Sequence, residues 1–485
     1  MHRLFTFDIQ MVCRTTSRNT LVLSRIRKNN KYYFFMKKIS LILSLFLSIT
    51  YCLQAQVQIR PLPKRGFEKR IHNAVYDIRL IDAHEHLISE KQGLAGSSDF
   101  TCLFENYQSS DMISSGLYPN MASDQIWERT EPAWEAMKST GYGRSVLLSA
   151  RGLFDIDDLN SDTYAELSKR IKASHQPGYY QRILKEKARI DLCIVMGSES
   201  EVISDDKNYF RSLMYVNGFS YFSDAFNKYT FSFERAKSFH SKYSNDVNTL
   251  EDYENMMDKA FRDGIEKGIL GVKNSWSYSR TLLCEEVSRE TANEIFEKMV
   301  SDPKREFSLQ EVKPLQDYLF FKVLSLCEKY NLPIQIHTGF QTYNGNYITN
   351  SNPTHLTNAF FKFPKVKFIL IHSAYPYGGE LAVLAKNFPN VYIDMTWTPI
   401  ISPSYSIRYL QEFLETVPSN KIMVFGGDCA IVEGSYGASI MAREVVEKTL
   451  IAMVKSGYFS EEEAIDIAQK LLRSNAIKIY DLKGF

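Results

Sequence analysis

The chain has 485 residues, of which 44% are hydrophobic and 24% are charged. This composition is typical of a folded protein and excludes a disordered, collagen-like or coiled-coil chain. Residues 1–55 carry nine Lys or Arg against Asp8 alone, whereas residues 56–485 carry 49 basic and 55 acidic side chains, a net charge of −6. A mildly acidic folded part has no general attraction for phosphates, so we expect a small-molecule substrate and no nucleic acid partner.

The N-terminal segment has the order of a secretory signal peptide. Lys37 and Lys38 precede the uncharged apolar run 39–53, and Ala55 follows it. The run is too short to span a bilayer comfortably, so we expect cleavage near Ala55 and no stable membrane anchor. Met36 is a natural start for such a signal; an uncleaved anchor or a buried helix is the alternative. The prediction is an extension and signal over 1–55 and an exported protein, periplasmic or secreted, over 56–485.

From about residue 78, short β-branched apolar runs alternate with longer amphipathic segments. This pattern predicts repeated βα units, and no glycine-rich dinucleotide fingerprint follows any strand. We therefore predict an α/β fold, a (β/α)8 TIM barrel filling 56–485, with long insertions over 87–144 and 197–249 at its C-terminal mouth. The eight expected strands are 78–84, 145–149, 191–196, 269–273, 333–337, 367–372, 391–394 and 421–426.

Two histidines end the first expected strand, in the order Asp82-Ala83-His84-Glu85-His86. Since strand side chains alternate with period two, His84 and His86 should point to the same side, which at a barrel mouth is the interior. Two imidazoles placed in this way can share one metal ion. An isolated His-x-His pair is more often structural, so the prediction depends on what the other strands end in.

Three other expected strands end in residues of the same kind. Strand five ends at His337, strand six at His372, and strand eight runs into Asp428. In a parallel barrel these strand ends converge on one mouth, where catalytic groups are found. A single such histidine is more often a core residue. Four histidines and an aspartate in this order, in a chain with only nine histidines, instead favour a metal site.

This arrangement resembles the metal-dependent amidohydrolase superfamily, in particular its amidohydrolase-2 branch. The segments 371–377, 390–394, 427–428 and 442–444 are similar to the amidohydrolase domain of nodulin and FluG-type proteins. The resemblance implies that His84, His86, His337 and Asp428 hold a divalent ion.

Neutral imidazoles with one carboxylate suit a single Zn²⁺ with one position left for water. Asp428 could then orient that water and accept its proton, while His372 polarises the substrate carbonyl or protonates the leaving group. The resulting prediction is a metal-dependent hydrolase that cleaves a C–N bond of amide type.

The fourth expected strand ends at Lys273 and is followed by Tyr278 and Arg280. We predict that these three contact the substrate, with Arg280 binding a carboxylate; a solvated strand end is the alternative. In the resembling FluG-type pattern the arginine adjoins the tyrosine, whereas Ser279 intervenes here. Some branches of the superfamily carboxylate a lysine at this strand to bridge two metals, so a two-metal site through Lys273 stays open.

Other functions use a similar site. The resembling branch includes decarboxylases, and its wider relatives include uronate isomerases, so a lyase or an isomerase is the alternative enzyme. A non-catalytic exported binding protein is a further alternative. It would be favoured by a missing ligand position, and none is missing.

The signal predicts the N-terminus of the mature protein. Mass spectrometry of the native protein should find a first residue close to Gln56, because the apolar run 39–53 is typical of a cleaved signal. Recovery of a chain that begins at Met1 from the cytosol would contradict export.

Overall fold

The structure is a computed structural model that describes residues 65–485 except 97, 106, 118–125, 198–206, 222–229, 235–246 and 343–344. The expected signal and cleavage site lie outside the described residues. Residues 63–485 form one unit by themselves. None of the helices in the described part is both long and apolar enough to cross a membrane.

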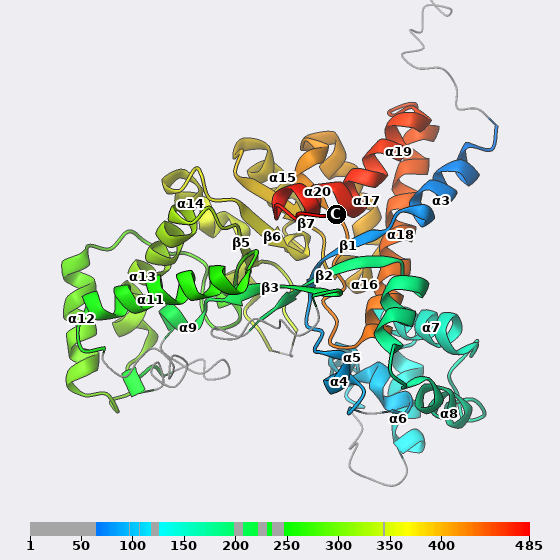
Figure 1. The fold of residues 1–485 in the computed structure, drawn as a ribbon, viewed down its shortest axis with the longest axis horizontal. Coiled ribbons are helices and arrows are strands. Elements are labelled where there is room, and N and C mark those ends of the chain that lie inside the picture. The colour runs from blue at the N-terminus through cyan, green and yellow to red at the C-terminus, as the bar shows by residue number, and fades with distance from the viewer. Residues whose placement is uncertain are drawn as a thin grey trace, which may run out of the picture. The chain divides into compact units, whose positions relative to one another are not determined.

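Eight parallel strands pair in chain order (Figure 1). The last strand is joined to the first by backbone hydrogen bonds: Ala83 N–H donates to the Phe425 carbonyl at 3.0 Å and Asp428 N–H to the His84 carbonyl at 2.9 Å. The prediction of a (β/α)8 barrel is therefore confirmed. The strands are β1 (Leu80–Glu85), β2 (Ile190–Met196), β3 (Phe210–Tyr215), β4 (Gly271–Asn274), β5 (Ile334–His337), β6 (Phe368–Ile371), β7 (Val391–Asp394) and β8 (Ile422–Met423).

One predicted strand is wrong and one was missed. Residues 145–149 lie in helix α7 (Gly141–Phe154), whose buried positions Ser145, Val146, Ser149 and Ala150 recur at helical spacing. Thr140 caps this helix by accepting a hydrogen bond from Gly143 N–H. The missed strand is β3, which lies inside the expected insertion 197–249. Its polar Arg211 and Ser212 interrupt the apolar run that marks the other strands.

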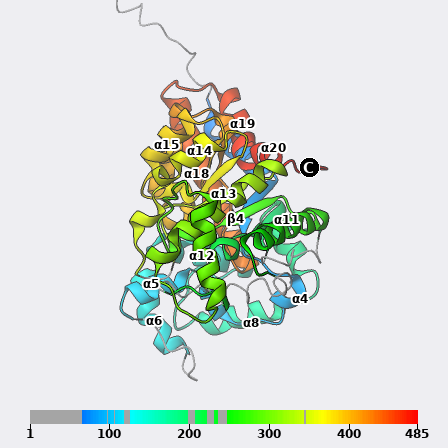
Figure 2. The ribbon, with the colours of Figure 1, turned by 90° about the vertical axis from the view of Figure 1, so that its left-hand side faces the viewer.

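Helices surround the barrel and cover its outer face. Figure 2 shows α11, α12 and α13 grouped together on one side, and one large core packs between strands and helices. A smaller cluster joins residues of β1, β2, β3, β6 and β8 to Ile479 and Tyr480. The helices after the first insertion are α9 (Gly218–Tyr221), α11 (Leu250–Lys267), α12 (Arg289–Ser301), α13 (Leu309–Lys329), α14 (Thr357–Lys362), α15 (Gly378–Asn387), α16 (Thr398–Ile401), α17 (Pro403–Thr416), α18 (Val432–Lys455), α19 (Glu461–Gln469) and α20 (Asn475–Ile479).

The connection between β1 and β2 is one long insertion over 86–189, because the expected strand within it is absent. Its helices gather on one side of the barrel in both views (Figures 1 and 2), and α7 packs against α16 and α18. They are α4 (Glu90–Gly93), α5 (Gln108–Ser114), α6 (Ile126–Met137), α7, and α8 (Tyr164–Ser174), while α3 (Phe67–Asp77) precedes β1. The insertion thus brings α5 toward the loops that follow the strands.

Candidate metal centre

The ends of β1 and β8 bring His84, His86 and Asp428 together. Their ligating atoms lie within 4.8 Å of one another. Nε2 of His86 is 2.9 Å and Nε2 of His84 is 3.4 Å from Oδ1 of Asp428. His84 and Asp428 are buried, whereas the His86 side chain is 33% exposed. The site is therefore reached from solvent on the His86 side.

This donor set fits a divalent cation. Burial and the nearby charge of Lys273 lower the pKa of His84 to about 4, so its imidazole is neutral, the form that binds metal. Burial alone would raise the pKa of Asp428, but hydrogen bonds from His84 and His86 hold it well below its usual range. Nδ1 of His84 is buried and has no hydrogen-bond partner among the described residues. Two imidazoles and a carboxylate form the N/O donor set of a zinc-like ion.

His337 and His372 form a second pair beside Asp428. Their facing nitrogens, Nδ1 of His337 and Nε2 of His372, are 3.0 Å apart. The outer nitrogens contact carbonyl oxygens: Nε2 of His337 that of Phe340 at 2.8 Å, and Nδ1 of His372 that of Thr396 at 3.1 Å. Because a carbonyl only accepts, the outer nitrogens carry the protons, and the inner ones face each other as lone pairs in the neutral rings.

Facing lone pairs are satisfied by a shared proton or by a shared cation. Burial lowers the pKa of His372 to about 3, and burial together with His372 lowers that of His337 well below its usual range, which disfavours the proton. Nε2 of His372 is also 3.8 Å from Oδ2 of Asp428. His337 is therefore next to His372, which adjoins Asp428, and is outside the three-residue group. The separate roles of His337 as ligand and His372 as catalyst stay predictions.

The carboxyl groups of Asp82 and Glu85 hold the backbone around Asp428. Asp82 accepts from Gly427 N–H at 3.2 Å, and Glu85 accepts from Cys429 N–H. Burial and the neighbouring Asp82 raise the pKa of Glu85 well above its usual range, so Glu85 keeps its proton and hydrogen-bonds Asp82. Asp428 itself has a positive φ of 55°, a conformation that needs support from its surroundings. The two acids that flank His84 therefore fix the position of the third ligand.

The three residues expected to contact the substrate, Lys273, Tyr278 and Arg280, lie in different surroundings in the structure. Tyr278 lies at the cluster, its ring centroid 4.7 Å from that of His337 and its hydroxyl accepting from Thr342 N–H. Lys273 is buried on β4, where burial lowers its pKa to about 8 while Asp428 and Asp394 attract its charge. A lower pKa increases the share of neutral amine that carboxylation requires, so the two-metal alternative stays open.

Arg280, which was expected to contact the substrate, is engaged by groups of the protein itself. Its guanidinium is buried and forms a 2.6 Å ion pair with Asp317, a 3.0 Å hydrogen bond to Gln316 and a cation–π contact with Trp276. It therefore joins its own loop to α13, with its side chain shielded from solvent. The spacing of Arg280 in the sequence gives no sign of this, because its partners come from another helix.

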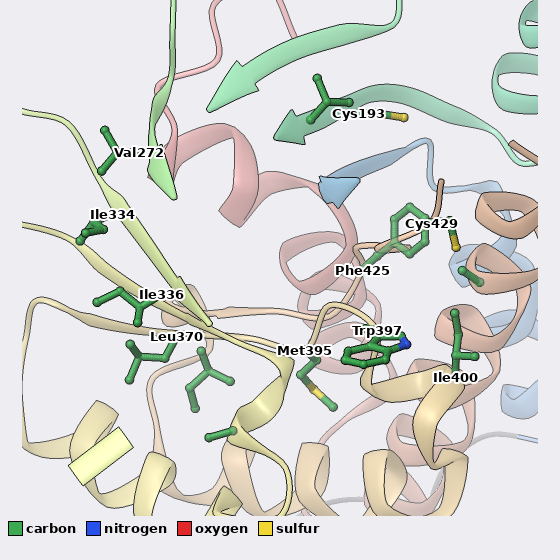
Figure 3. Packing of buried hydrophobic residues seen from close by; sticks show 14 of the residues in the cluster. Cys193, Val272, Ile334, Ile336, Leu370, Met395, Trp397, Ile400, Phe425 and Cys429 are labelled. Carbon is green, nitrogen blue, oxygen red and sulfur yellow. The ribbon is translucent and has the colours of Figure 1, made fainter. Parts of the chain in front are cut away.

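Two aromatic residues at the site were not predicted. Tyr107 precedes α5, hydrogen-bonds Asp428 and lies over Trp397 with ring centroids 4.2 Å apart. Trp397 is fully buried in the loop after β7, near Met395 (Figure 3), and its ring is 5.2 Å from that of His372. The position of Trp397 just after a strand could have indicated it. Nothing in the sequence marks Tyr107, since it lies in a long insertion.

Removal of a ligand should weaken metal binding. We expect about one Zn²⁺ per chain, and His84→Ala should lower its affinity by more than the roughly 10- to 100-fold typical of losing an outer hydrogen-bond partner. His337→Ala should lower it too, whereas His72→Ala, at an exposed position on α3, should not. Competition with a chelating dye measures the affinity. Unchanged affinity in the first two variants would refute the site.

The carboxyl pair can be tested with variants at Glu85. Glu85→Leu leaves Cys429 N–H buried without an acceptor, which should lower the free energy of unfolding by about 1–3 kcal/mol and alter the visible spectrum of bound Co²⁺. Glu85→Gln keeps an acceptor for Cys429 N–H and a donor for Asp82, so it should restore both. An unaltered Co²⁺ spectrum in Glu85→Leu would show that the pair does not position Asp428.

Comparisons with known proteins place part of the sequence and the fold among known proteins. Residues 303–482 match the amidohydrolase family model. The chain is 33% identical to protein fluG of Emericella nidulans over 204 residues. The matched residues cover 41% of this chain but only 23% of fluG. In fold it is similar to glucuronate isomerase from Caulobacter crescentus, with a TM-score of 0.72 and 16% identity over 87% of this chain and 96% of that one. It is also similar in fold to a protein from Lactobacillus casei described as a metal-dependent hydrolase, with a TM-score of 0.60 and 18% identity. That match covers 85% of this chain and 97% of the other. The C-terminal part of the chain, residues 303–482, is thus similar in sequence to the amidohydrolase family.

Proposed function

We propose that this protein is an exported metal-dependent hydrolase that cleaves an amide-type C–N bond of a small molecule. The observation that carries the proposal is the group of His84, His86 and Asp428 at the barrel mouth, with His337 and His372 beside it. Export is supported by the signal-like segment 36–55. Hydrolysis is supported by the carboxylate of Asp428 in the ligand group and by the neutral imidazole of His372 beside it.

A bound divalent ion, for which we propose Zn²⁺, would supply Lewis acidity, polarising a carbonyl oxygen and making water a stronger acid. His84, His86, His337 and Asp428 would hold it. Of the Asp428 oxygens, Oδ1 faces His84 and His86, while Oδ2 faces His372. The carboxylate is ionised because its pKa is held down by the imidazoles. Asp428 can therefore orient an attacking water and accept its proton.

His372 is suited to act on the substrate, whereas Asp428 acts on the attacking water. The Thr396 carbonyl fixes its Nδ1, which directs Nε2 toward His337 and Asp428. Trp397 packs edge-on against the imidazole and limits its rotation. From this position His372 can polarise the substrate carbonyl or pass a proton to the leaving nitrogen. Tyr107, beside Asp428, and Tyr278, beside His337, can orient the substrate.

Variants at the two acid–base residues test this assignment. A screen of simple amides and N-acyl amino acids should find a substrate, and His372→Asn should lower its turnover about 10²- to 10⁴-fold while most of the metal stays bound. Asp428→Asn should lose both metal and turnover, because an amide is a poorer ligand and cannot take the proton.

Two outcomes would contradict the proposal. If His372→Asn loses its ion but keeps its rate per bound metal, His372 is a ligand and not a catalyst. If the protein interconverts hexuronates or decarboxylates hydroxybenzoates and hydrolyses no amide, the isomerase or lyase alternative replaces the hydrolase.

A further inference from the structure

The loops that follow β5, β6, β7 and β8 contain no cationic side chain. Segments 338–352, 372–378, 395–402 and 426–432 hold no Lys and no Arg, and their only acidic residue is Asp428. These loops border the metal centre, since they begin where His337, His372 and Asp428 lie. A substrate carboxylate would therefore find no guanidinium or ammonium on this side of the mouth.

The two cations expected near the site are already engaged. Arg280 is bound to Asp317 and Gln316. Lys273 is buried on β4, where the carboxylates of Asp428 and Asp394 attract its charge. Neither offers a free charge to an anionic part of a substrate.

Two glutamines, one at the start of α5 and one in the loop after β5, are buried with unpaired amide atoms. Gln108 and Gln341 are each 5% exposed. Oε1 of Gln108, and both Oε1 and Nε2 of Gln341, have no hydrogen-bond partner among the described residues. A buried polar atom left unpaired costs about 1–3 kcal/mol, so such atoms are normally satisfied by a protein group or a ligand.

Both glutamines adjoin residues that contact the metal centre. Gln108 follows Tyr107, which hydrogen-bonds Asp428. Gln341 lies between Phe340, whose carbonyl accepts from His337, and Thr342, whose N–H donates to Tyr278. The hydroxyls of Ser110 and Thr342 are 3.3 Å apart, which brings the two segments side by side.

We propose that Gln108 and Gln341 form a subsite for an uncharged hydrogen-bonding group of the substrate, such as a primary amide, and that this subsite rejects a carboxylate. An amide N–H can donate to the Oε1 atoms, and its carbonyl can accept from Nε2 of Gln341. A carboxylate offers acceptors only, so it could accept from Nε2 of Gln341 but would leave both Oε1 atoms without a donor. The inference rests on the proposed function, because it concerns the substrate of the same site.

The test uses three hydroxamates that bind a metal centre through the same group. Acetohydroxamate carries no further polar group, the succinic monohydroxamate carries a carboxylate, and its primary amide replaces that carboxylate with an uncharged isostere. Calorimetry on the Zn²⁺-loaded protein should show the amide probe binding at least about 10-fold more tightly than the carboxylate probe.

Variants connect the preference to the two glutamines. Gln108→Leu and Gln341→Leu should each reduce the ratio of the two affinities, and the double variant should bring it near one. Acetohydroxamate should bind them all with unchanged affinity, which shows that each variant is folded. Gln411→Leu, at an exposed position on α17, is the matched control and should leave the ratio unchanged.

Each result decides a different claim. If acetohydroxamate binds but the amide probe has no advantage, or if the advantage survives in the double variant, the subsite is refuted and the hydrolase proposal stands. If acetohydroxamate does not bind the Zn²⁺-loaded protein, the metal centre of the proposed function fails, and the subsite fails with it.

Discussion

The joint between β1 and β8 is the constraint on which the rest of the site depends. Backbone hydrogen bonds from Ala83 to Phe425, from Asp428 to His84 and from His86 to Cys429 close the barrel at the place where the ligands lie. The joint needs small residues: a Cβ at Gly427 would collide with the Glu85 carboxyl group, and one at Gly426 would collide with the Thr396 side chain. The contacts that close the barrel therefore also position His84, His86 and Asp428.

Around this joint the strand ends hold the candidate metal ligands, and α5 and the loops hold the residues proposed to contact the substrate. Strand ends provide histidines whose pKa values are lowered by burial, so they stay neutral and able to bind metal. The long insertion after β1 provides Tyr107, and the loop after β7 provides Trp397, which packs against it. This division is typical of barrels in which the reaction is fixed by strand ends and the substrate by loops.

The sequence predicts the parts of the site that follow strands and fails where partners are distant in the chain. His84, His86, His337, His372 and Asp428 each follow an apolar run, and parallel strands must bring such ends together. Residues 145–149 resemble a strand because five residues cannot show the 3.6-residue period that makes them part of α7. Arg280 looked available because its partner Asp317 lies 37 residues away on α13.

The insertion residues could not be predicted for a related reason. Tyr107 and Gln108 lie in a segment with no strand end to place it, and its position depends on how α7 packs against α16 and α18. The burial of Gln341 is also set by tertiary packing and not by its neighbours in the sequence. The local sequence pattern therefore indicates the candidate ligands, whereas the residues proposed to select the substrate are found only in the assembled barrel.

The most direct test of the central claim is anomalous diffraction from crystals of the protein loaded with Co²⁺. The account predicts one strong peak bonded to the imidazoles of His84 and His86 and to the carboxylate of Asp428, with His337 as a further ligand. A second peak next to Lys273 would favour the two-metal alternative. Ordered cobalt only at sites away from His84, His86 and Asp428 would contradict the account.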